Sequence, residues 1–271
     1  MSHTKPSIPK PSIALSNESR CIANERSKAA TAFLTLPLVI QAALQHAKRV
    51  VLIANNPSVT RVQLEKQLQP DDVVVLFNHF IHAEFFANHL LASSLPKLLF
   101  FRQIGDSNLH FGLPPRSNHI SMMRQMAETA PLGILLSNQS YQFPSPADDP
   151  RPDDDPITTD RVLTIPSRLQ ELLLDPSHHS VLSDQHSVVA DYPTFEDIHS
   201  SAPSSGFLLY RLFLAAREYV QHTQQVAQPI ELVMVGFNDN DKTAHFWHGH
   251  NWAFERQEML AAPRGVEIYR Y

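Results

Sequence analysis

The sequence predicts an α/β protein of Rossmann-like type, in which a mostly parallel sheet carries helices on both faces. Short, continuous apolar runs such as residues 50–54 (Val-Val-Leu-Ile-Ala) are typical of strands that are buried on both faces. Stretches with apolar residues at helical spacing, such as residues 38–48, separate these runs. The chain of 271 residues is 43% hydrophobic, which is sufficient for a core of this size.

The alternation of helix and strand continues along most of the chain. Lys48 and Arg49 end the first helix, where basic residues favour the helix dipole, and Ser58 is the expected N-cap of the second helix. In chain order, the predicted strands are residues 50–54, 73–77, 97–101, 132–136, 161–165 and 230–235. The predicted helices are residues 38–48, 59–69, 82–91, 120–128, 167–174 and 206–225. Such alternation indicates βαβ units and therefore a parallel sheet.

The predicted organisation is one domain preceded by a flexible N-terminal arm. The arm covers residues 1–30, and three prolines without an apolar run stand at its beginning. Residues 31–271 are expected to form the single α/β domain. An irregular insert is expected within it at residues 138–202, because residues 145–156 hold four prolines and five aspartates and residues 175–201 show weak periodicity.

Composition and charge exclude several classes of protein. The formal net charge is −5, so no nucleic-acid partner is expected. The chain has only seven glycines and neither a G-x-x-x-x-G-K-[ST] nor a G-x-G-x-x-G motif, which argues against a glycine-rich phosphate loop. The single cysteine, Cys21, excludes an intramolecular disulfide and fits a reducing compartment. The best apolar window, residues 34–44, contains Pro37 and is shorter than the roughly 20 residues of a membrane span, so a cytoplasmic location is expected.

Polar side chains follow three of the predicted strands at the point where each strand ends. Asn55 and Asn56 come after the first strand, Asn78 after the second, and a stretch rich in His, Trp and Asn follows Gly236. Ligands of open parallel sheets bind at the carboxyl ends of the strands. An amide both donates and accepts hydrogen bonds, which suits a nucleobase or ribose. A single Asn here would be a turn residue, but three clusters at one edge favour a ligand site.

The long predicted helix begins with the sequence Pro-Ser-Ser-Gly at residues 203–206. The hydroxyl groups of Ser204 and Ser205 can cap the helix, and the free N–H groups together with the helix dipole can bind an anion. Taken alone, the motif is most simply a helix cap.

The densest cluster of candidate catalytic residues lies at residues 245–255. It contains His245, His248 and His250, and Glu255 follows five residues after the last of them. An imidazole with a nearby carboxylate to orient it is a suitable general base. Three histidines within six residues, flanked by two tryptophans, favour a catalytic function over a plain helix start on the surface.

Two long segments resemble the motifs of one enzyme family in their order and spacing. The runs at residues 50–56 and 73–78 are similar to its first long motif, in which one strand ends in Gly-Asn-Ser and a second ends in Arg-x-Asn. The Pro-Ser-Ser-Gly sequence, followed by a helix, a strand and Gly236-Phe237, is similar to its second motif, Pro-Ser-Thr-Gly…Gly-Phe.

Two shorter segments complete the resemblance. Residues 245–248 resemble a short motif rich in His and Tyr, and residues 250–255 match a His-x4-Glu motif. The family is that of the sialyltransferases, which use CMP-sialic acid. This chain departs from it at Ala54, Asn56 and Leu76, where the family has Gly, Ser and Arg. The disulfide that joins the long motifs in the animal enzymes cannot form here, which fits a cytosolic, bacterial-type relative.

The resemblance implies a GT-A-like variant of the fold and an inverting transfer that needs neither a cofactor nor a metal. By analogy, His250 would deprotonate the acceptor hydroxyl with support from Glu255, and His245 or His248 would donate to the departing CMP phosphate. The residues implied in nucleotide binding are Asn55, Asn56, Asn78, Ser204, Ser205 and Gly206.

The partners implied by the resemblance are a CMP-sugar donor and a glycan or glycolipid acceptor. The donor sugar is sialic acid or Kdo, another acidic keto-sugar that is carried by CMP. The expected acceptor is a lipopolysaccharide or capsule precursor, which the protein would meet at the cytoplasmic face of the inner membrane.

Two alternative interpretations involve a metal. His248, His250 and Glu255 spell the His-x-His-x4-Glu pattern of a cupin site, but no later histidine supplies a fourth ligand, and the α/β pattern conflicts with an all-β barrel. Asp239 and Asp241 form an Asp-x-Asp pattern after a strand, as in nucleotide-sugar transferases that hold Mg²⁺ or Mn²⁺. A CMP donor has one phosphate and less need of such a bridging metal.

A third alternative is a carbohydrate-binding protein without catalytic activity. Trp247 and Trp252 offer aromatic faces on which a sugar ring can stack. Dependence on a nucleotide would distinguish an enzyme from such a protein.

Overall fold

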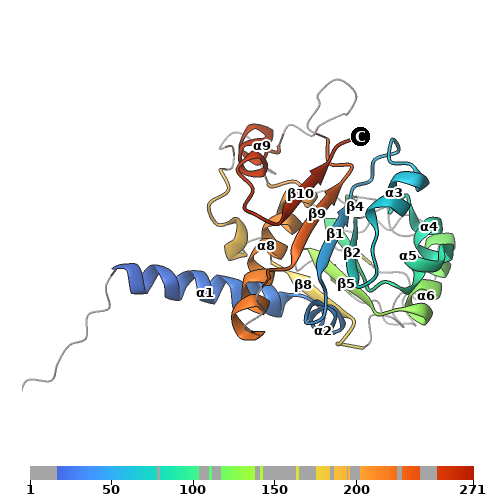
Figure 1. Ribbon diagram of the computed structural model, residues 1–271, viewed down its shortest axis with the longest axis horizontal. Helices are drawn as coiled ribbons and strands as arrows, with labels where there is room; N and C mark the ends of the chain where they lie inside the picture. The colour runs from blue at the N-terminus through green and yellow to red at the C-terminus, as the bar shows by residue number, and fades with distance from the viewer. Residues whose placement is uncertain are drawn as a thin grey trace, which may run out of the picture.

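The computed structural model is built around a parallel β-sheet with helices on both sides (Figure 1). It describes residues 17–77, 80–103, 110–111, 117–137, 141–142, 163–164, 175–183, 186–193, 195, 202–224, 228–238 and 249–271. The predicted Rossmann-like α/β class is therefore confirmed.

Seven parallel strands of the described residues form the main sheet, in the order β10-β9-β1-β2-β3-β5-β8. Their bounds are β1 Arg49–Ile53, β2 Asp72–Phe77, β3 Lys97–Gln103, β5 Leu132–Ser137, β8 His179–Leu182, β9 Glu231–Val235 and β10 Val266–Tyr269. Strand β4 (His110–Phe111) pairs antiparallel with β3, and β6 (Tyr141–Gln142) pairs with β7 (Leu163–Thr164) in a separate small sheet. The central strands are buried on both faces, as their continuous apolar runs require.

The strand order reverses at β1. From β1 the chain adds β2, β3, β5 and β8 on one side, and it then returns to place β9 and β10 on the other side. The carboxyl ends of β1 and β9 therefore meet at the topological switch point of the sheet. In open α/β sheets this is the place where ligands bind.

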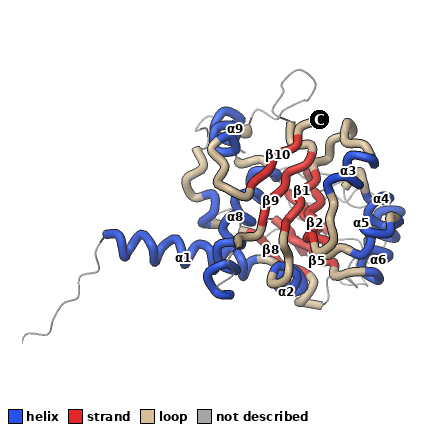
Figure 2. The backbone as a smooth tube through the Cα atoms, viewed as in Figure 1, coloured by secondary structure: helices blue, strands red, loops and turns tan. Residues whose placement is uncertain are grey.

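The helices form two layers that enclose the sheet (Figure 2). One layer consists of α1 (Asn17–Thr35), α2 (Leu38–Leu44) and α8 (Ser205–Gln224). The other consists of α3 (Arg61–Gln67), α4 (Ala83–Asn88), α5 (Leu90–Ser94) and α6 (Ser117–Thr129). The 3₁₀ turn η1 (Ser187–Val189) and the helix α9 (Trp252–Leu260) lie beside α8.

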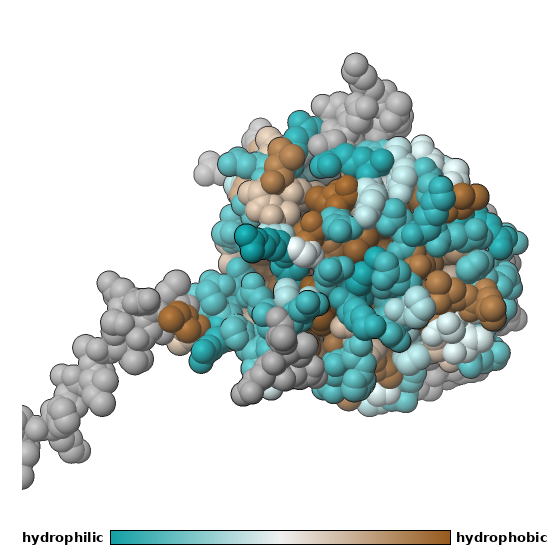
Figure 3. Space-filling model, viewed as in Figure 1, coloured by the Kyte–Doolittle hydropathy of each residue, from teal (hydrophilic) through white to brown (hydrophobic). Residues whose placement is uncertain are grey.

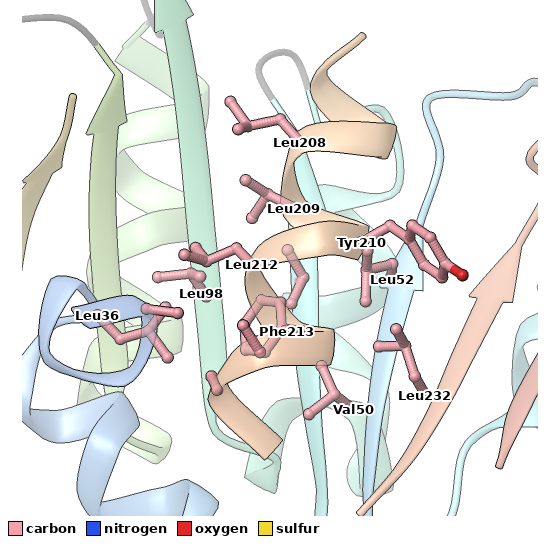
Figure 4. Packing of buried hydrophobic residues seen from close by; sticks show 14 of the residues in the cluster. Leu36, Val50, Leu52, Leu98, Leu208, Leu209, Tyr210, Leu212, Phe213 and Leu232 are labelled. Atoms are coloured by element: carbon pink, nitrogen blue, oxygen red, sulfur yellow. The ribbon is translucent and has the colours of Figure 1, made fainter. Parts of the chain in front are cut away.

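Alternate residues of each strand face the two helix layers. Val50 and Leu52 of β1 pack in the same buried cluster as Leu212 of α8, whereas Val51 and Ile53 pack on the other side. Figure 4 shows how leucines and aromatic residues of α8 lie against the strands. Each cluster therefore fills the space between one face of the sheet and one helix layer.

The long helix α1 differs from the prediction of a flexible arm over residues 1–30. The last half of α1 buries Ala32 and Phe33, and the Phe33 ring stacks on Tyr219 of α8 with a centroid distance of 4.7 Å. Residues 22–27 are exposed, and this part of the helix extends away from the body of the molecule (Figure 1). Residues 1–16 lie outside the described part. The apolar contact with α8 explains why the helix extends to Thr35.

Several helix boundaries differ from the predicted ones. Helix α3 begins at Arg61, and its N-cap is Thr60 instead of Ser58, because Thr60 and Gln63 form a reciprocal capping box. The single helix predicted over residues 82–91 is divided into α4 and α5 at His89, which has extended backbone dihedrals.

The predicted insert at residues 138–202 contributes a strand to the main sheet. This strand is β8, which pairs with β5 and buries Leu182. Strand β10 was also not predicted. The helix predicted over residues 167–174 lies outside the described residues.

The surface shown in Figure 3 is largely hydrophilic, with separate apolar areas. The exposed large apolar residues come from different elements and include Leu34, Leu90 and Leu260. Among the described residues, no single helix is long and apolar enough to cross a membrane. The consecutive segments Ile22–Thr35 and Leu38–Leu44 pass that test only together, and they are bent by 119°.

Candidate functional site

Asn55 and Asn56 connect the ends of three neighbouring strands at the switch point. The Asn55 amide donates to the carbonyl oxygen of Phe77 at the end of β2 (2.6 Å), and its Oδ1 accepts from the Ile81 N–H (3.2 Å). The Asn56 amide donates to the carbonyl oxygen of Gly236 after β9 (3.0 Å). The side chains that the sequence singled out as ligand contacts therefore also brace the edge on which a ligand would rest.

The start of α8 lies directly against the end of β9. A Cβ on Gly206 would be 2.3 Å from Cε1 of Phe237, a distance at which atoms overlap. Gly236, before Phe237, has a φ of +79°, and a Cβ there would be 2.5 Å from Val59. Both glycines of the Pro-Ser-Ser-Gly…Gly-Phe pattern are thus required by close approach. They place the N-terminus of α8 at the carboxyl edge.

The buried carboxylate of Glu255 is bound by residues from two distant segments. Glu255 is 2% exposed. Its Oε1 accepts from the Ser204 N–H (2.7 Å) and the Tyr192 hydroxyl (2.9 Å), and its Oε2 accepts from the Ser204 hydroxyl (2.6 Å). Ser204 is also the N-cap of α8, since its Oγ accepts from the Phe207 N–H (3.1 Å). One carboxylate therefore joins the His-x4-Glu motif to the start of α8.

His250 lies next to this network and is 5% exposed. Its Nδ1 is 2.6 Å from the carbonyl oxygen of Ala202, and the Trp252 ring meets it edge to face with a centroid distance of 5.0 Å. A carbonyl oxygen can only accept, so Nδ1 carries the proton in the neutral ring and the lone pair is on Nε2. This is the tautomer that a general base acting through Nε2 requires.

The beginning of α9 is positioned by the same contacts. Asn251 caps α9 by accepting from the Phe254 N–H (3.1 Å), and the Asn251 N–H donates to the Tyr192 hydroxyl (2.6 Å). The Ala202 N–H donates to the carbonyl oxygen of Gly249 (3.1 Å). Tyr192 thus contacts both residues that flank the first turn of α9, Asn251 and Glu255. From the start of α9, His250 and Glu255 therefore both contact the segment at residues 202–204.

Arg211 fixes α9 against α8 at a distance from this start. Its Nη2 donates to both carboxylate oxygens of Asp191 (2.7 and 2.8 Å), and its Nη1 donates to Glu258 of α9 (2.7 Å). The same group lies 5.8 Å from the centroid of the Phe207 ring. Arg211 and Tyr192 were not predicted from the sequence. The arginine inside the apolar stretch of α8 was a usable signal, whereas nothing marks Tyr192 in its irregular segment.

Two buried polar atoms at the carboxyl edge have no hydrogen-bond partner among the described residues. They are Nε2 of His82 and Oγ of Ser205. Burial lowers the pKa of His82 below its usual value, against a weaker opposite effect of the Asn56 backbone. His82 lies four residues after Asn78. The sequence predicted it as part of the helix over residues 82–91 and not as a site residue.

The structure brings together three of the predicted site residues, Ser204, His250 and Glu255, at residues 202–204. Asn55 and Asn56 lie at the carboxyl end of β1, and Gly206 packs against Phe237, which follows the Gly236 carbonyl group that Asn56 binds. Ser205 is in the same helix start. The predicted residues Asn78, His245 and His248 lie outside the described part of the chain, as do Asp239, Asp241 and Trp247 of the alternative interpretations. Within the described part, no three His, Cys, Asp or Glu side chains are grouped as metal ligands.

A cavity of about 410 Å³ opens at the opposite edge of the sheet, near the amino ends of β1 and β9. Its lining includes His46, Lys48, Arg49 and Glu231. Arg49 is paired with Asp72 in this region, so its charge is already compensated. The cavity lies far along the strands from Asn55 and Gly236, and we do not include it in the candidate site.

Comparison of the chain with protein-family models, with curated proteins and with solved structures finds no match.

Proposed function

We propose that this protein is a glycosyltransferase of GT-A-like type that moves an acidic keto-sugar, sialic acid or Kdo, from a CMP donor to a hydroxyl group of a surface glycan or glycolipid. The transfer inverts the configuration at the anomeric carbon and requires no metal. The proposal includes a cytoplasmic location and an encounter with the acceptor at the membrane face.

The observation that carries this proposal is the junction between Glu255 and Ser204. The two residues belong to segments that are separate in the sequence and that resemble two different motifs of the sialyltransferases. Three hydrogen bonds bring Ser204 and Tyr192 to the Glu255 carboxylate, and His250 meets Ala202 two residues before Ser204. The Pro-Ser-Ser-Gly segment is proposed to bind the donor, and the His-x4-Glu segment is proposed to activate the acceptor. Contact between the two supports one site for both substrates at the carboxyl edge, where ligands of open α/β sheets bind.

In the proposed reaction the acceptor hydroxyl oxygen attacks the anomeric carbon of the sugar. The bond from that carbon to the CMP phosphate oxygen breaks, and the phosphate leaves with the electron pair. His250 takes the hydroxyl proton on Nε2, the nitrogen opposite the one that faces Ala202. Glu255 acts as a positioning residue, because it fixes the segment that contains Ala202 and Ser204.

The remaining proposed residues bind the donor. Asn55, Asn56 and Asn78 contact the nucleotide. Ser204, Ser205 and Gly206 form the start of α8, where the Ser205 hydroxyl group and the N–H groups of the first turn that remain free face its negative charge. His245 or His248 donates to the leaving phosphate. A base on one face and an anion stabiliser on the other suit a transition state with oxocarbenium character.

The experiment that tests the proposal compares wild type with His250→Ala in transfer from CMP-sialic acid and CMP-Kdo. A positioned base contributes about 10²–10⁴-fold, so kcat should fall by that factor while CMP affinity changes little. His222→Ala is the control, because His222 is exposed in the last turn of α8. A folded His250→Ala variant with near wild-type turnover would overturn the assignment.

Calorimetry and chelation test the donor and the absence of a metal. CMP should bind in preference to UDP, and transfer should persist in excess EDTA. Tight UDP binding without CMP binding would contradict the CMP donor. Loss of activity in EDTA that Mn²⁺ restores would instead favour the Asp239 and Asp241 site.

A further inference from the structure

His82 lies in the turn that follows β2, beside the residues that brace the switch point. The neighbouring Ile81 N–H donates to Oδ1 of Asn55 (3.2 Å), and the His82 ring interacts with the backbone of Asn56. The turn is therefore attached to both asparagines that follow β1. This position puts the imidazole at the carboxyl edge of the sheet, where the proposed donor would bind.

The Nε2 atom of His82 is buried, and no described residue forms a hydrogen bond with it. An unsatisfied buried polar atom destabilises the folded protein, and such atoms are few in native structures. A ligand that supplies the missing hydrogen bond would remove this penalty on binding. The unsatisfied nitrogen is thus an observation that points to a ligand.

The turn also contains a strained residue. Phe80 has a φ of +28°, which side chains with a Cβ rarely adopt. Its ring is 2% exposed and lies edge to face with Phe101 at 6.3 Å, and its N–H and carbonyl group bond to Phe77 and Ala83 (2.8 Å each). These contacts maintain the strained conformation that leads the chain to His82. Strain held in this way is concentrated at functional sites.

We propose that His82 is a further nucleotide-binding residue, whose Nε2 forms a hydrogen bond with an uncharged polar group of the donor, a ribose hydroxyl or the edge of the base. The identity of the ligand rests on the proposed function. An uncharged group is the expected partner because burial lowers the pKa of His82 and keeps the imidazole neutral near pH 7. A neutral ring can donate or accept a hydrogen bond but does not attract phosphate by charge.

The test is calorimetric titration of the full chain with CMP, cytidine and UDP, for wild type, His82→Phe and His82→Gln. His46→Gln is the matched control, since His46 is exposed at the opposite edge of the sheet. His82→Phe should weaken CMP and cytidine to the same extent, by roughly 3- to 10-fold, the effect of one hydrogen bond. Its Tm without ligand should fall by little, because Nε2 has no described partner and only the interaction of the ring with the Asn56 backbone is lost. His82→Gln, which retains a donor and an acceptor, should bind with intermediate affinity.

The possible outcomes separate this inference from the proposed function. If wild type binds CMP and both variants bind it equally well, His82 is not a contact and the CMP donor stands. If wild type binds UDP instead and His82→Phe weakens UDP, His82 stands as a nucleotide contact and the CMP donor does not. Weakening of CMP without weakening of cytidine would contradict the uncharged partner. A wild-type protein that binds none of the three ligands would overturn both proposals.

Discussion

At the amino edge of the sheet, buried charges are matched with partners, whereas at the carboxyl edge two buried polar atoms have none among the described residues. Arg49, Asp72 and Lys97 begin three adjacent strands, and each donates to or accepts from nearby groups. Nε2 of His82 and Oγ of Ser205 are the unmatched atoms at the other edge. The two edges are the opposite ends of the same strands. Membership of the sheet therefore does not explain why buried polar groups have partners at one end while these two atoms have none among the described residues at the other.

The charged groups at the amino edge stabilise the fold through their partners. The two atoms without a described partner at the carboxyl edge are the ones that we propose for ligand binding. Other polar groups at the carboxyl edge do have partners, and the most completely engaged is the carboxylate of Glu255. Its partners are Ser204 at the start of α8 and Tyr192, which follows η1. We therefore expect substitutions at the amino edge to change stability alone, and those at the carboxyl edge to change binding as well.

The largest expected effect on stability is that of Asp72→Asn at the amino edge. Asp72 is 1% exposed and accepts from Nε and a terminal nitrogen of Arg49 (2.9 and 2.8 Å) and from the Gln69 N–H (2.7 Å). An amide would present N–H groups to the guanidinium and leave the Arg49 charge buried and unpaired. The free energy of unfolding in urea should fall by about 3–5 kcal/mol.

The control for this substitution is Asp71→Asn. Asp71 and Lys48 are 3.8 Å apart with exposed side chains, so the change should be within about 0.5 kcal/mol. Nucleotide affinity should be unaffected by either substitution. A decrease in CMP affinity for Asp72→Asn at a temperature where it is folded would contradict the separation of the two edges.

A smaller effect, dependent on pH, is expected from Lys97. Lys97 is 0% exposed, its ammonium donates to the carbonyl oxygens of Ser93 (2.9 Å) and Leu95 (2.7 Å), and burial lowers its pKa from 10.5 to about 8. Between these values the unfolded chain binds the proton and the folded chain does not. This group therefore makes the free energy of unfolding rise with pH across that window, by at most roughly 3 kcal/mol.

Lys97→Met should remove this rise. Urea unfolding of both proteins from pH 7 to pH 10.5 measures it, and the difference between the two curves cancels groups that titrate in both, such as tyrosines. Curves that remain parallel over the whole range would show that Lys97 keeps an ordinary pKa.

The sequence predicts those elements whose pattern of apolar residues lies within one short segment. It does not predict elements that depend on contacts between distant segments. The central strands were predicted because strands buried on both faces need continuous apolar runs, as in Val50–Ile53 and Val73–Phe77. Strand β8 was missed because only one of its four residues, Leu182, is buried, so the strand has no continuous apolar run. Helix α1 was assigned to an arm because its stability comes from contact with α8, which is distant in sequence.

The candidate site was predicted only as far as its residues stand in sequence motifs. The motifs name Ser204, His250 and Glu255 as candidates, but they do not predict which atoms form hydrogen bonds with one another. The contacts with Ala202 and Tyr192 arise from tertiary packing between segments that lack a pattern. His82 was missed because an unsatisfied nitrogen is a property of the folded structure and has no signal in the sequence.

Among the substitutions of buried charged residues, the smallest expected change in stability is that of Glu255→Gln, the amide substitution at the carboxyl edge that corresponds to Asp72→Asn. The three hydrogen bonds of Glu255 described here come from neutral donors, and Gln can keep two of them on its oxygen while its amide nitrogen donates to Oγ of Ser204. These three hydrogen bonds lose their charge assistance, so the free energy of unfolding should fall by about 1 kcal/mol. Glu218→Gln, on the exposed face of α8, controls for the loss of a negative charge.

The CMP affinity of the Glu255→Gln variant should nevertheless decrease by up to about tenfold. The Ser204 hydroxyl would have to stop donating to residue 255, and the start of α8 would shift. A loss of 3 kcal/mol or more with unchanged CMP affinity would show that Glu255 serves the fold in the way that Asp72 does, and the contrast between the two edges would then fail at its central residue.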